Sequence, residues 1–412
     1  MKPLKAPELR IKLAKDGNSL VIINAQEKEH SIPCRLTDAN ASEYRLALKK
    51  TLDEAKAFLR GERLSLKDAS NAFEKLNQRG LSLIYQIFPG NGREVVKIFQ
   101  EAFPRWKTQE HPAAITVEAE LSRLVPLDLL PLFELAEWPR VGDRRIMEGA
   151  ARRFLGFSTI IRREFTTLRV SQDLVLDNNP KLPLKCFYDR GLAGADSEIS
   201  FFKRNAGKKG CLDFDGPWPE NRLDPKEFHK SLAHHLRHAD RRFDGKHRAL
   251  SDQVQHFVCH CDIDDTISSD SQLRFSDGNT VSIAELQARF LILEAGKILE
   301  EGKEAKDGPL IFLNACGTSR IDPMAITSFP RFFLEDNRNR GFIGTETNIP
   351  DAFAANFSRS FYRSLLKGIP LGQAIHNAKW EMLRVKNNPL GILYIVYADP
   401  DLHVSNPVAD LN

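Results

Sequence analysis

The run of residues 310–313 constrains the fold of this chain more than any other stretch. Its sequence, Leu-Ile-Phe-Leu, is apolar throughout, and small or polar residues follow directly in Asn314-Ala315-Cys316-Gly317. A short strand that is apolar on both faces is typical of a parallel sheet with helices on either side. In open sheets of this kind, ligands and reactive groups gather at the carboxyl ends of the strands. The sequence therefore places Cys316 at the edge where chemistry is expected.

A second strand, with the sequence Val-Gln-His-Phe-Val-Cys, is expected at residues 254–259, which lead into His260. Between the two strands lie a hairpin with its turn at Asp277-Gly278 and a helix that begins at Ser282-Ile283-Ala284-Glu285, the pattern of a capping box. A strand, a crossover helix and a second strand form a right-handed βαβ unit, in which the two strands are parallel. We therefore expect His260 and Cys316 at the same edge of one sheet.

A cysteine nucleophile needs a basic partner, since a free thiol with a pKa of about 8.5 is mostly protonated at neutral pH. Taken alone, a cysteine beside apolar residues is more often an inert packing group. The imidazole of His260, expected at the neighbouring strand end, favours the reactive interpretation of Cys316.

The chain divides into two expected parts. Residues 1–108 are predicted to form a hairpin around Asp16-Gly17-Asn18, followed by amphipathic helices. Residues 109–412 alternate strand and helix patterns, which predicts a mostly parallel α/β sheet. Within them, residues 207–225 are rich in glycine and proline and are interpreted as a loop.

Composition bears on the compartment and the partners. The 412 residues carry a net charge of +4 with both signs mixed, and the basic cluster at residues 237–248 is interpreted as a solvated face, so nucleic acid is not an expected partner. No apolar run approaches the roughly 20 residues of a membrane helix, and no signal segment opens the chain. Six scattered cysteines are typical of reduced thiols. We expect a soluble cytoplasmic protein without a membrane partner.

Zinc is the competing chemistry for Cys259-His260-Cys261. Adjacent strand residues point to opposite faces, so these three side chains reach one tetrahedral ion only if the strand breaks. His234, His235 and His238 put two imidazoles on one helix face but lack a third convergent ligand, which favours an exposed histidine-rich face. His256, in mid-strand, is expected in the core. We expect no metal and no cofactor.

A set of short motifs occurs in the order found in a known family. They are residues 254–261, Asp277-Gly278, Phe312-Leu313-Asn314-Ala315-Cys316-Gly317-Thr318, Gly344-Thr345, Pro350-Asp351, residues 361–371, Gln373-Ala374 and Ala398-Asp399-Pro400. Together they resemble the CHAT domain, a caspase-like cysteine peptidase of the separase and caspase clan. The resemblance is dense over about 250–404 and weaker over about 110–250, where Pro126-Leu127-Asp128-Leu129-Leu130 resembles the family motif Pro-Trp-Glu-Leu-Leu. It does not extend to the N-terminal helices.

The resemblance implies a caspase-like fold, with a mostly parallel sheet sandwiched by helices, and a His–Cys dyad. Cys316 would be the nucleophile and His260 the general base and acid, while the backbone N–H groups of Cys261 and Cys316 would bind the oxyanion. The family usually has glycine where this chain has Cys261, and a non-glycine residue is strained there if φ must be positive. Gly317 also replaces a common Glu or Gln.

Two hypotheses about function follow. The first is an endopeptidase that cleaves a protein substrate through a Cys316 thioester, with the N-terminal helices as a docking surface for an activating partner, since members of the family often act in regulated bacterial defence or cell death. The second is a catalytically inactive scaffold for protein binding, which the Cys261 substitution favours.

Acidic residues flank the expected crevice. Asp262, Glu346 and Asp351 are candidates for a pocket that selects Lys or Arg before the scissile bond by charge complementarity, with Asp264 and Asp265 nearby. The alternative is a solvated rim of loop carboxylates.

Overall fold

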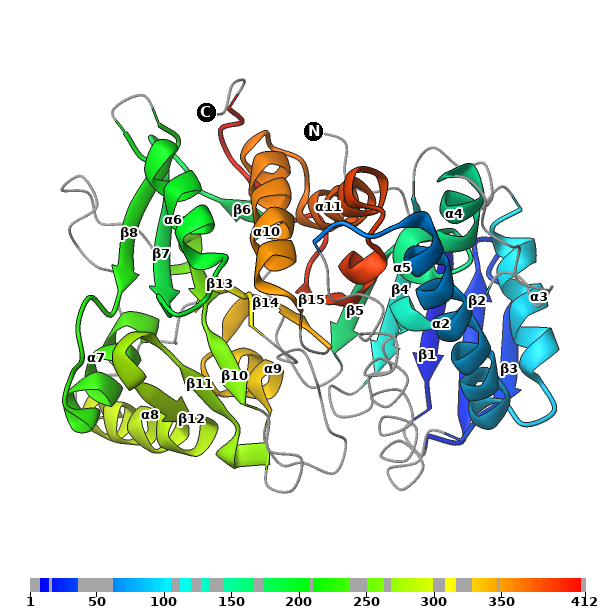
Figure 1. Cartoon of the computed structure of the whole chain (residues 1–412). Helices are drawn as coiled ribbons and strands as arrows, with labels where there is room; N and C mark the ends of the chain where they lie inside the picture. The colour runs from blue at the N-terminus through cyan, green and yellow to red at the C-terminus, as the bar shows by residue number, and fades with distance from the viewer. Residues whose placement is uncertain are drawn as a thin grey trace.

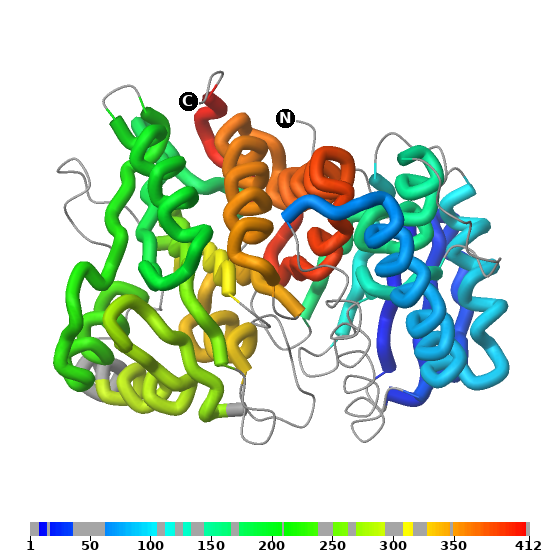
Figure 2. Tube along the Cα trace, in the orientation of Figure 1, coloured from blue at the N-terminus to red at the C-terminus, as the bar shows by residue number. Residues whose placement is uncertain are grey.

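The computed structural model describes the protein over residues 8–14, 17–35, 62–104, 112–119, 127–132, 144–165, 173–207, 210–237, 250–262, 268–298 (without the side chains of 293–298), 308–315, 328–346 and 349–408. Two main sheets lie side by side in this part of the chain, with the helices α10 (Asp351–Leu366) and α11 (Leu371–Lys386) between them (Figures 1 and 2). The described helices include none that is both long and apolar enough to cross a membrane.

The larger sheet has six strands in the order β15-β14-β13-β9-β7-β8. Its neighbours are parallel except for β15, which runs antiparallel to β14. The strands are β7 (Leu182–Tyr188), β8 (Leu212–Trp218), β9 (Val254–Val258), β13 (Gly308–Leu313), β14 (Asn339–Thr345) and β15 (Tyr394–Ala398). The prediction of a mostly parallel α/β sheet, with the strands at residues 254–259 and 310–313 adjacent and parallel, is confirmed.

Helices cover both faces of this sheet, which explains why the residues of β9 and β13 are buried throughout. On one face, Phe202 of α6 (Ala195–Arg204) and Tyr362 of α10 contact the ring of His256. The next residue of β9, Phe257, points to the other face, where it contacts Phe275 and Phe333. This other face also carries α7 (Pro225–Arg237), α8 (Ile283–Ile298), α9 (Phe329–Arg331) and the π-helical turn η6 (Phe332–Asp336).

A small antiparallel sheet extends from the carboxyl end of β9. It has the order β10-β11-β12 and consists of β10 (His260–Asp262), β11 (Gln272–Arg274) and β12 (Thr280–Ser282). The hairpin predicted at Asp277-Gly278 is therefore confirmed, and both of these residues have positive φ angles, 60° and 75°. The predicted capping box is confirmed as well, since Glu285 N–H donates to Ser282 Oγ and Ser282 N–H donates to Glu285 Oε2.

The second main sheet has five strands in the order β3-β2-β1-β4-β5. They are β1 (Leu9–Leu13), β2 (Ser19–Asn24), β3 (Glu29–Pro33), β4 (Ala113–Ala119) and β5 (Thr159–Phe165), with helices α2 (Leu66–Ile87), α3 (Gly92–Ala102), α4 (Arg144–Ala151) and the short α5 (Leu155–Ser158) close by. The predicted N-terminal hairpin is confirmed as β1–β2, and the amphipathic helices predicted after it include α2 and α3. A further helix predicted between Leu46 and Leu59 lies outside the described residues.

The division of the chain at residues 108 and 109 stays a prediction. The pairing of the strands bears on it, because β1 is parallel to β4 and the two are adjacent in one sheet. The N-terminal part is therefore not helical throughout, and strands from both sides of the expected boundary share a sheet. A separate two-stranded sheet pairs β6 (Val175–Leu176) with β16 (His403–Val404) near the end of the chain.

The loop predicted at residues 207–225 is wrong in its central part. Residues 212–218 form β8, which pairs with β7 at the edge of the larger sheet. Proline is tolerated in an edge strand because one side of the strand needs no ladder donor, and Pro217 occupies such a strand. Helical turns lead into two of the strands: α5 precedes β5, and η7 (Pro389–Leu393) precedes β15.

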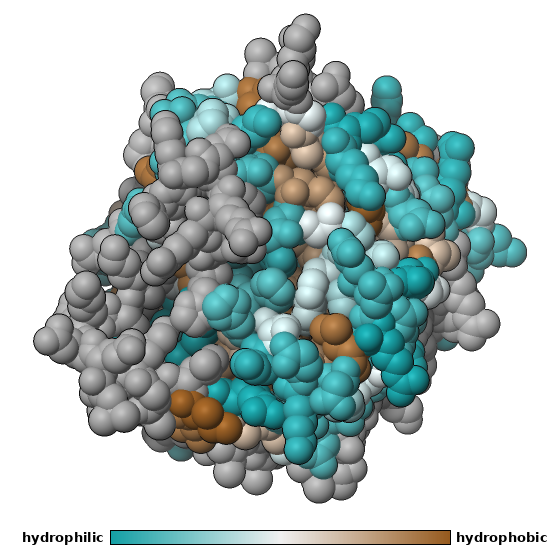
Figure 3. Space-filling model, turned by 90° about the vertical axis from the view of Figure 1, so that its left-hand side faces the viewer, coloured by the Kyte–Doolittle hydropathy of each residue, from teal (hydrophilic) through white to brown (hydrophobic). Residues whose placement is uncertain are grey.

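Figure 3 shows the side of the molecule that lies at the left of Figure 1, where β8 and α7 are. The residues coloured in this view are mostly hydrophilic, with smaller apolar patches. Leu291 and Ile292 of α8 are among the exposed large apolar side chains of the described residues, at 67% and 62% exposure. Scattered apolar side chains on a surface are normal for a folded protein.

Candidate active site

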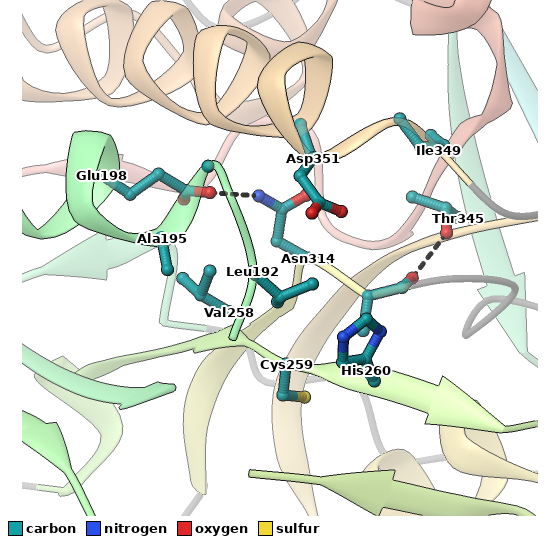
Figure 4. A pocket seen from close by; sticks show the side chains of 13 residues that line it. Leu192, Ala195, Glu198, Val258, Cys259, His260, Asn314, Thr345, Ile349 and Asp351 are labelled. Carbon is teal, nitrogen blue, oxygen red and sulfur yellow. Dashed lines mark hydrogen bonds between the residues drawn. The ribbon is translucent and has the colours of Figure 1, made fainter. Parts of the chain in front are cut away.

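A pocket lies at the carboxyl ends of β9, β13 and β14, where the sequence predicts the site. Its empty volume is about 380 Å³ including the open mouth. Figure 4 shows that side chains from several elements surround it. The described lining residues are Leu192, Gly194, Ala195, Glu198, Val258, Cys259, His260, Asn314, Ala315, Thr345, Ile349, Asp351 and Ala354.

His260 enters this pocket from the start of β10, two residues after the end of β9. Its side chain is 36% exposed, so solvent or a ligand reaches the ring. The backbone is held by the β10–β11 ladder, in which His260 pairs with Arg274. The prediction that His260 lies just beyond the end of the strand at 254–259 is confirmed.

The chain that leads to Cys316 is fixed by four hydrogen bonds. Asn314 N–H donates to Phe257 O over 2.9 Å, Asn314 Nδ2 donates to Glu198 Oε1 over 2.9 Å, and Tyr394 OH donates to Asn314 Oδ1 over 2.7 Å. Thr345 Oγ1 donates to Ala315 O over 2.7 Å. Cys316, the next residue in the sequence, lies outside the described residues. The two residues before it line the same pocket as His260.

Glu198 is a site residue that the sequence analysis missed. It is 1% exposed, and its carboxylate also accepts hydrogen bonds from His256 Nε2 over 2.7 Å and from Ser358 Oγ over 2.6 Å. A signal was present, because Glu198 occupies a core position of an amphipathic helix, beside Ala195, Ile199 and Phe202. A carboxylate on the apolar face of a helix indicates a buried polar network.

His256 is buried as predicted and belongs to this network. It is 0% exposed, and Tyr362 OH lies 3.2 Å from its Nδ1. Burial raises the pKa of Tyr362 well above its ordinary value, so the phenol stays protonated and can donate this hydrogen bond. The network connects β9, α6, α10 and β13 beneath the pocket.

Asp189 is a second residue that the sequence analysis did not single out. It follows β7, the neighbour of β9, and its Oδ2 lies 3.8 Å from His260 Nε2. The residues that follow it are rich in glycine and predict a turn, but the position of Asp189 beside His260 follows from the strand order of the sheet, which no local pattern reveals.

Cys261 is in extended backbone and is 7% exposed. It pairs with Leu273 of β11, and it is absent from the non-glycine residues with positive φ. The strain that a non-glycine residue would suffer at positive φ is therefore not present. Cys34, Cys186, Cys211, Cys259 and Cys261 are all buried thiols.

Of the three acidic candidates, one lines the pocket and two do not. Asp351, at the start of α10, lines the pocket, and its Oδ2 accepts a hydrogen bond from Ala193 N–H over 3.1 Å. Asp262 is exposed on β10 and Glu346 is 6% exposed after β14, and neither lines the pocket. Among the described residues, no group of three His, Cys, Asp or Glu is arranged to hold a metal ion.

The fold and the site define a class: a mostly parallel α/β protein with a histidine-lined pocket at the carboxyl ends of its central strands. Residues 220–403 match the family model of the CHAT domain. A probable protease of Vitiosangium sp. (strain GDMCC 1.1324) is 30% identical over 103 residues, which cover 25% of this chain and 13% of that protein.

Two solved structures of the Saccharomyces cerevisiae separase–securin complex are similar to this chain at low level. The identities are 9% and 10%, and the TM-scores are 0.47 and 0.45. The matches cover 96% and 95% of this chain but 30% of the separase chain in each case. This chain therefore corresponds to a small part of the relatives it matches.

Proposed function

We propose that this protein is a cysteine endopeptidase with a His260–Cys316 dyad. The observation that carries the proposal is that His260 and the two residues before Cys316 line one pocket at adjacent strand ends. The CHAT domain over residues 220–403 and the probable protease among the similar proteins support the same activity.

The reaction is an acyl transfer in two steps. The Cys316 thiolate attacks the scissile carbonyl carbon, the backbone N–H groups of Cys261 and Cys316 stabilise the oxyanion, and the imidazolium of His260 protonates the leaving amine as the C–N bond breaks. A water molecule, deprotonated by His260, then attacks the thioester, which releases the acid product and the thiol. No cofactor enters this scheme.

Asp351 is the proposed specificity residue. Its carboxylate lines a pocket that is otherwise mostly apolar, and it has no cationic partner among the described residues. A Lys or Arg side chain of the substrate would bring the missing positive charge into the pocket. The other two candidates from the sequence, Asp262 and Glu346, do not line the pocket, so we do not propose them as specificity residues.

A positional-scanning peptide library tests the role of Asp351. We expect cleavage after Lys or Arg in the wild type and at least a tenfold loss of that preference in Asp351→Ala, with cleavage after an uncharged residue retained. Asp262→Ala is the matched control and is expected to keep the wild-type preference. A wild-type library profile without any preference for Lys or Arg would disprove the acidic pocket.

Covalent labelling tests the dyad itself. A peptidyl electrophile should label Cys316, and His260→Ala should abolish the labelling, while His403→Ala should not. Burial raises the pKa of the Cys186 and Cys211 thiols, which keeps them protonated and poorly reactive. A folded protein whose Cys316 stays unlabelled with and without activating extract would support the alternative, a catalytically inactive scaffold.

The physiological setting is also a proposal. We place the protein in the cytoplasm, where the described free cysteines stay reduced, and in a regulated bacterial defence or cell-death system, with a partner that docks on the N-terminal part. Mass spectrometry of new protein termini in cells with the wild type or Cys316→Ala, before and after phage challenge, would identify the substrate. Equal cleavage before and after challenge would contradict regulation of this kind.

A further inference from the structure

Asp189 lies beside His260, where a third residue could assist the proposed His260–Cys316 dyad. It directly follows β7, and its N–H donates to Val258 O at the end of β9 over 2.7 Å, which continues the pairing of the two strands beyond their ends. Asp189 is therefore placed by the β7–β9 ladder, beside the strand that leads into His260. Its side chain is 12% exposed, so its carboxylate is partly shielded from solvent.

The two carboxylate oxygens of Asp189 contact different partners. Oδ1 accepts the N–H of Gly191 over 2.9 Å, which fixes the rotation of the side chain. Oδ2 is directed at His260 and lies 3.8 Å from Nε2. This distance is longer than a direct hydrogen bond and is that of a close ion pair. Catalytic contacts of this kind are often loose without substrate and shorten when it binds.

Hydrogen bonds with Ser276 also hold the residues before and after Asp189. Ser276 Oγ donates to Tyr188 O over 3.1 Å and accepts from Arg190 N–H over 2.9 Å. A Cβ on Gly191 would lie 3.2 Å from Asp189 Oδ1, a contact so close that the carboxylate would have to move. The position of the carboxylate is thus determined by the backbone around it.

Other charged groups surround His260. Arg274 is directly opposite it in the β10–β11 ladder, where a positive charge disfavours the imidazolium. Glu198 and Asp351 line the same pocket, Cys259 precedes His260, and Asp262 follows on the same strand. Asp189 Oδ2 lies within ion-pair distance of the His260 ring, whereas the carboxylate of Glu198 is bound to His256, Asn314 and Ser358.

We propose that Asp189 is a positioning residue that holds the proton of His260 on Nε2 and stabilises the imidazolium. Nδ1 is then left for the thiol of Cys316, and the thiolate–imidazolium pair is favoured over the neutral pair. This inference rests on the proposed peptidase function. A change in the pH dependence of Cys316 reactivity makes the effect measurable.

The test is the pH dependence of Cys316 alkylation by iodoacetamide, measured on the Cys316 peptide by mass spectrometry in the full chain. Asp189→Asn keeps an acceptor for Gly191 N–H but removes the charge. We expect the midpoint of the rate profile to rise by about one pH unit, which is about a tenfold loss of rate below the midpoint. Asp277→Asn is the control, because Asp277 pairs with Arg190 in the same region, 3.2 Å away, and it should leave the profile unchanged.

The outcomes separate the two proposals. If His260→Ala changes the profile and Asp189→Asn does not, the role of Asp189 is wrong and the dyad stands. If neither variant changes an ordinary thiol profile, the dyad itself is wrong. A second measurement needs no change at Asp189: nitrogen NMR of Cys316→Ser at high pH should find neutral His260 protonated on Nε2, and protonation on Nδ1 would overturn the inference.

Discussion

At the scale of single residues, Glu198 connects the core of the protein to the candidate site. It is buried on α6, and its carboxylate accepts hydrogen bonds from His256, Asn314 and Ser358. A buried carboxylate is costly unless such partners surround it, and with them it fixes the groups that it binds. The position of Asn314, two residues before Cys316, therefore depends on a residue more than one hundred positions earlier.

Replacement of Glu198 measures this dependence. Glu198→Ala removes the acceptor for three buried donors, and since each unsatisfied donor costs about 1–3 kcal/mol, we expect the free energy of unfolding to fall by about 3 kcal/mol. Urea unfolding gives the value. Glu381→Ala is the matched control: this exposed residue of α11 accepts one hydrogen bond, from Ser360, and its loss is expected to cost less than about 1 kcal/mol. Equal effects of the two variants would contradict the role of Glu198.

His376 of α11 makes stability depend on pH. Burial, together with the charges of Lys379, Arg152 and Arg384, lowers its pKa from 6.5 to about 3. The unfolded chain therefore binds a proton below pH 6.5 while the folded chain does not, and stability falls as the pH falls. Between pH 7.5 and 5.5 this residue should remove about 1.4 kcal/mol from the free energy of unfolding.

The variant His376→Gln isolates this effect, because glutamine does not titrate. Urea unfolding of both proteins at pH 7.5 and 5.5 should show a smaller change for the variant, by that same amount. An identical pH dependence in the two proteins would mean that His376 accepts a proton in the folded state.

At the scale of elements, local signals in the sequence were reliable where a short pattern determines the structure. The capping box before α8, the turn at Asp277-Gly278 and the apolar strands β9 and β13 are of this kind. The strand β8 is the opposite case, since Pro217 and Pro219 indicate a loop unless it is known that the strand lies at an edge.

The capping box offers a prediction at this scale. Ser282→Ala removes the acceptor for Glu285 N–H at the start of α8, and the loss of such a cap lowers the free energy of unfolding by about 1 kcal/mol. A double-mutant cycle with Glu285→Ala should show that the two changes together cost less than their sum, because both remove the same reciprocal contacts. Strict additivity would show that the capping box does not act as a unit.

At the scale of the whole molecule, a buried ionic cluster joins the N-terminal sheet to the C-terminal helices. Arg163 of β5 contacts Asp128, which lies in the short 3₁₀ helix η2 (Leu127–Leu129), and Lys379 of α11 donates to Asp128 Oδ1 over 3.2 Å. Burial by itself raises the pKa of Asp128, but the two cations hold it below its ordinary value. Asp128 belongs to the motif that resembles Pro-Trp-Glu-Leu-Leu, so this motif has a structural role here.

Asp128→Asn tests the cluster, because it leaves two buried cations without a carboxylate. Breaking a buried ion pair from one side costs about 3–5 kcal/mol, and we expect a loss in that range by urea unfolding. Lys379→Met is the matched control: it leaves the Arg163–Asp128 pair intact, and the loss is expected to stay below about 1.5 kcal/mol, as for an apolar replacement of similar volume. A larger loss in Lys379→Met than in Asp128→Asn would contradict this account.

The sequence by itself determined the order of strands and helices around the candidate site. The strand patterns, the hairpin turn and the capping box are local, and a crossover helix between two strands then favours parallel strands in one sheet, as β9 and β13 are. Three features depended on the tertiary structure: the contact of Asp189 with His260, the hydrogen bond from Asn314 to Glu198, and the pairing of β1 with β4. Each joins residues that are distant in sequence, and such contacts are selected by the packing of whole elements, which no local pattern encodes.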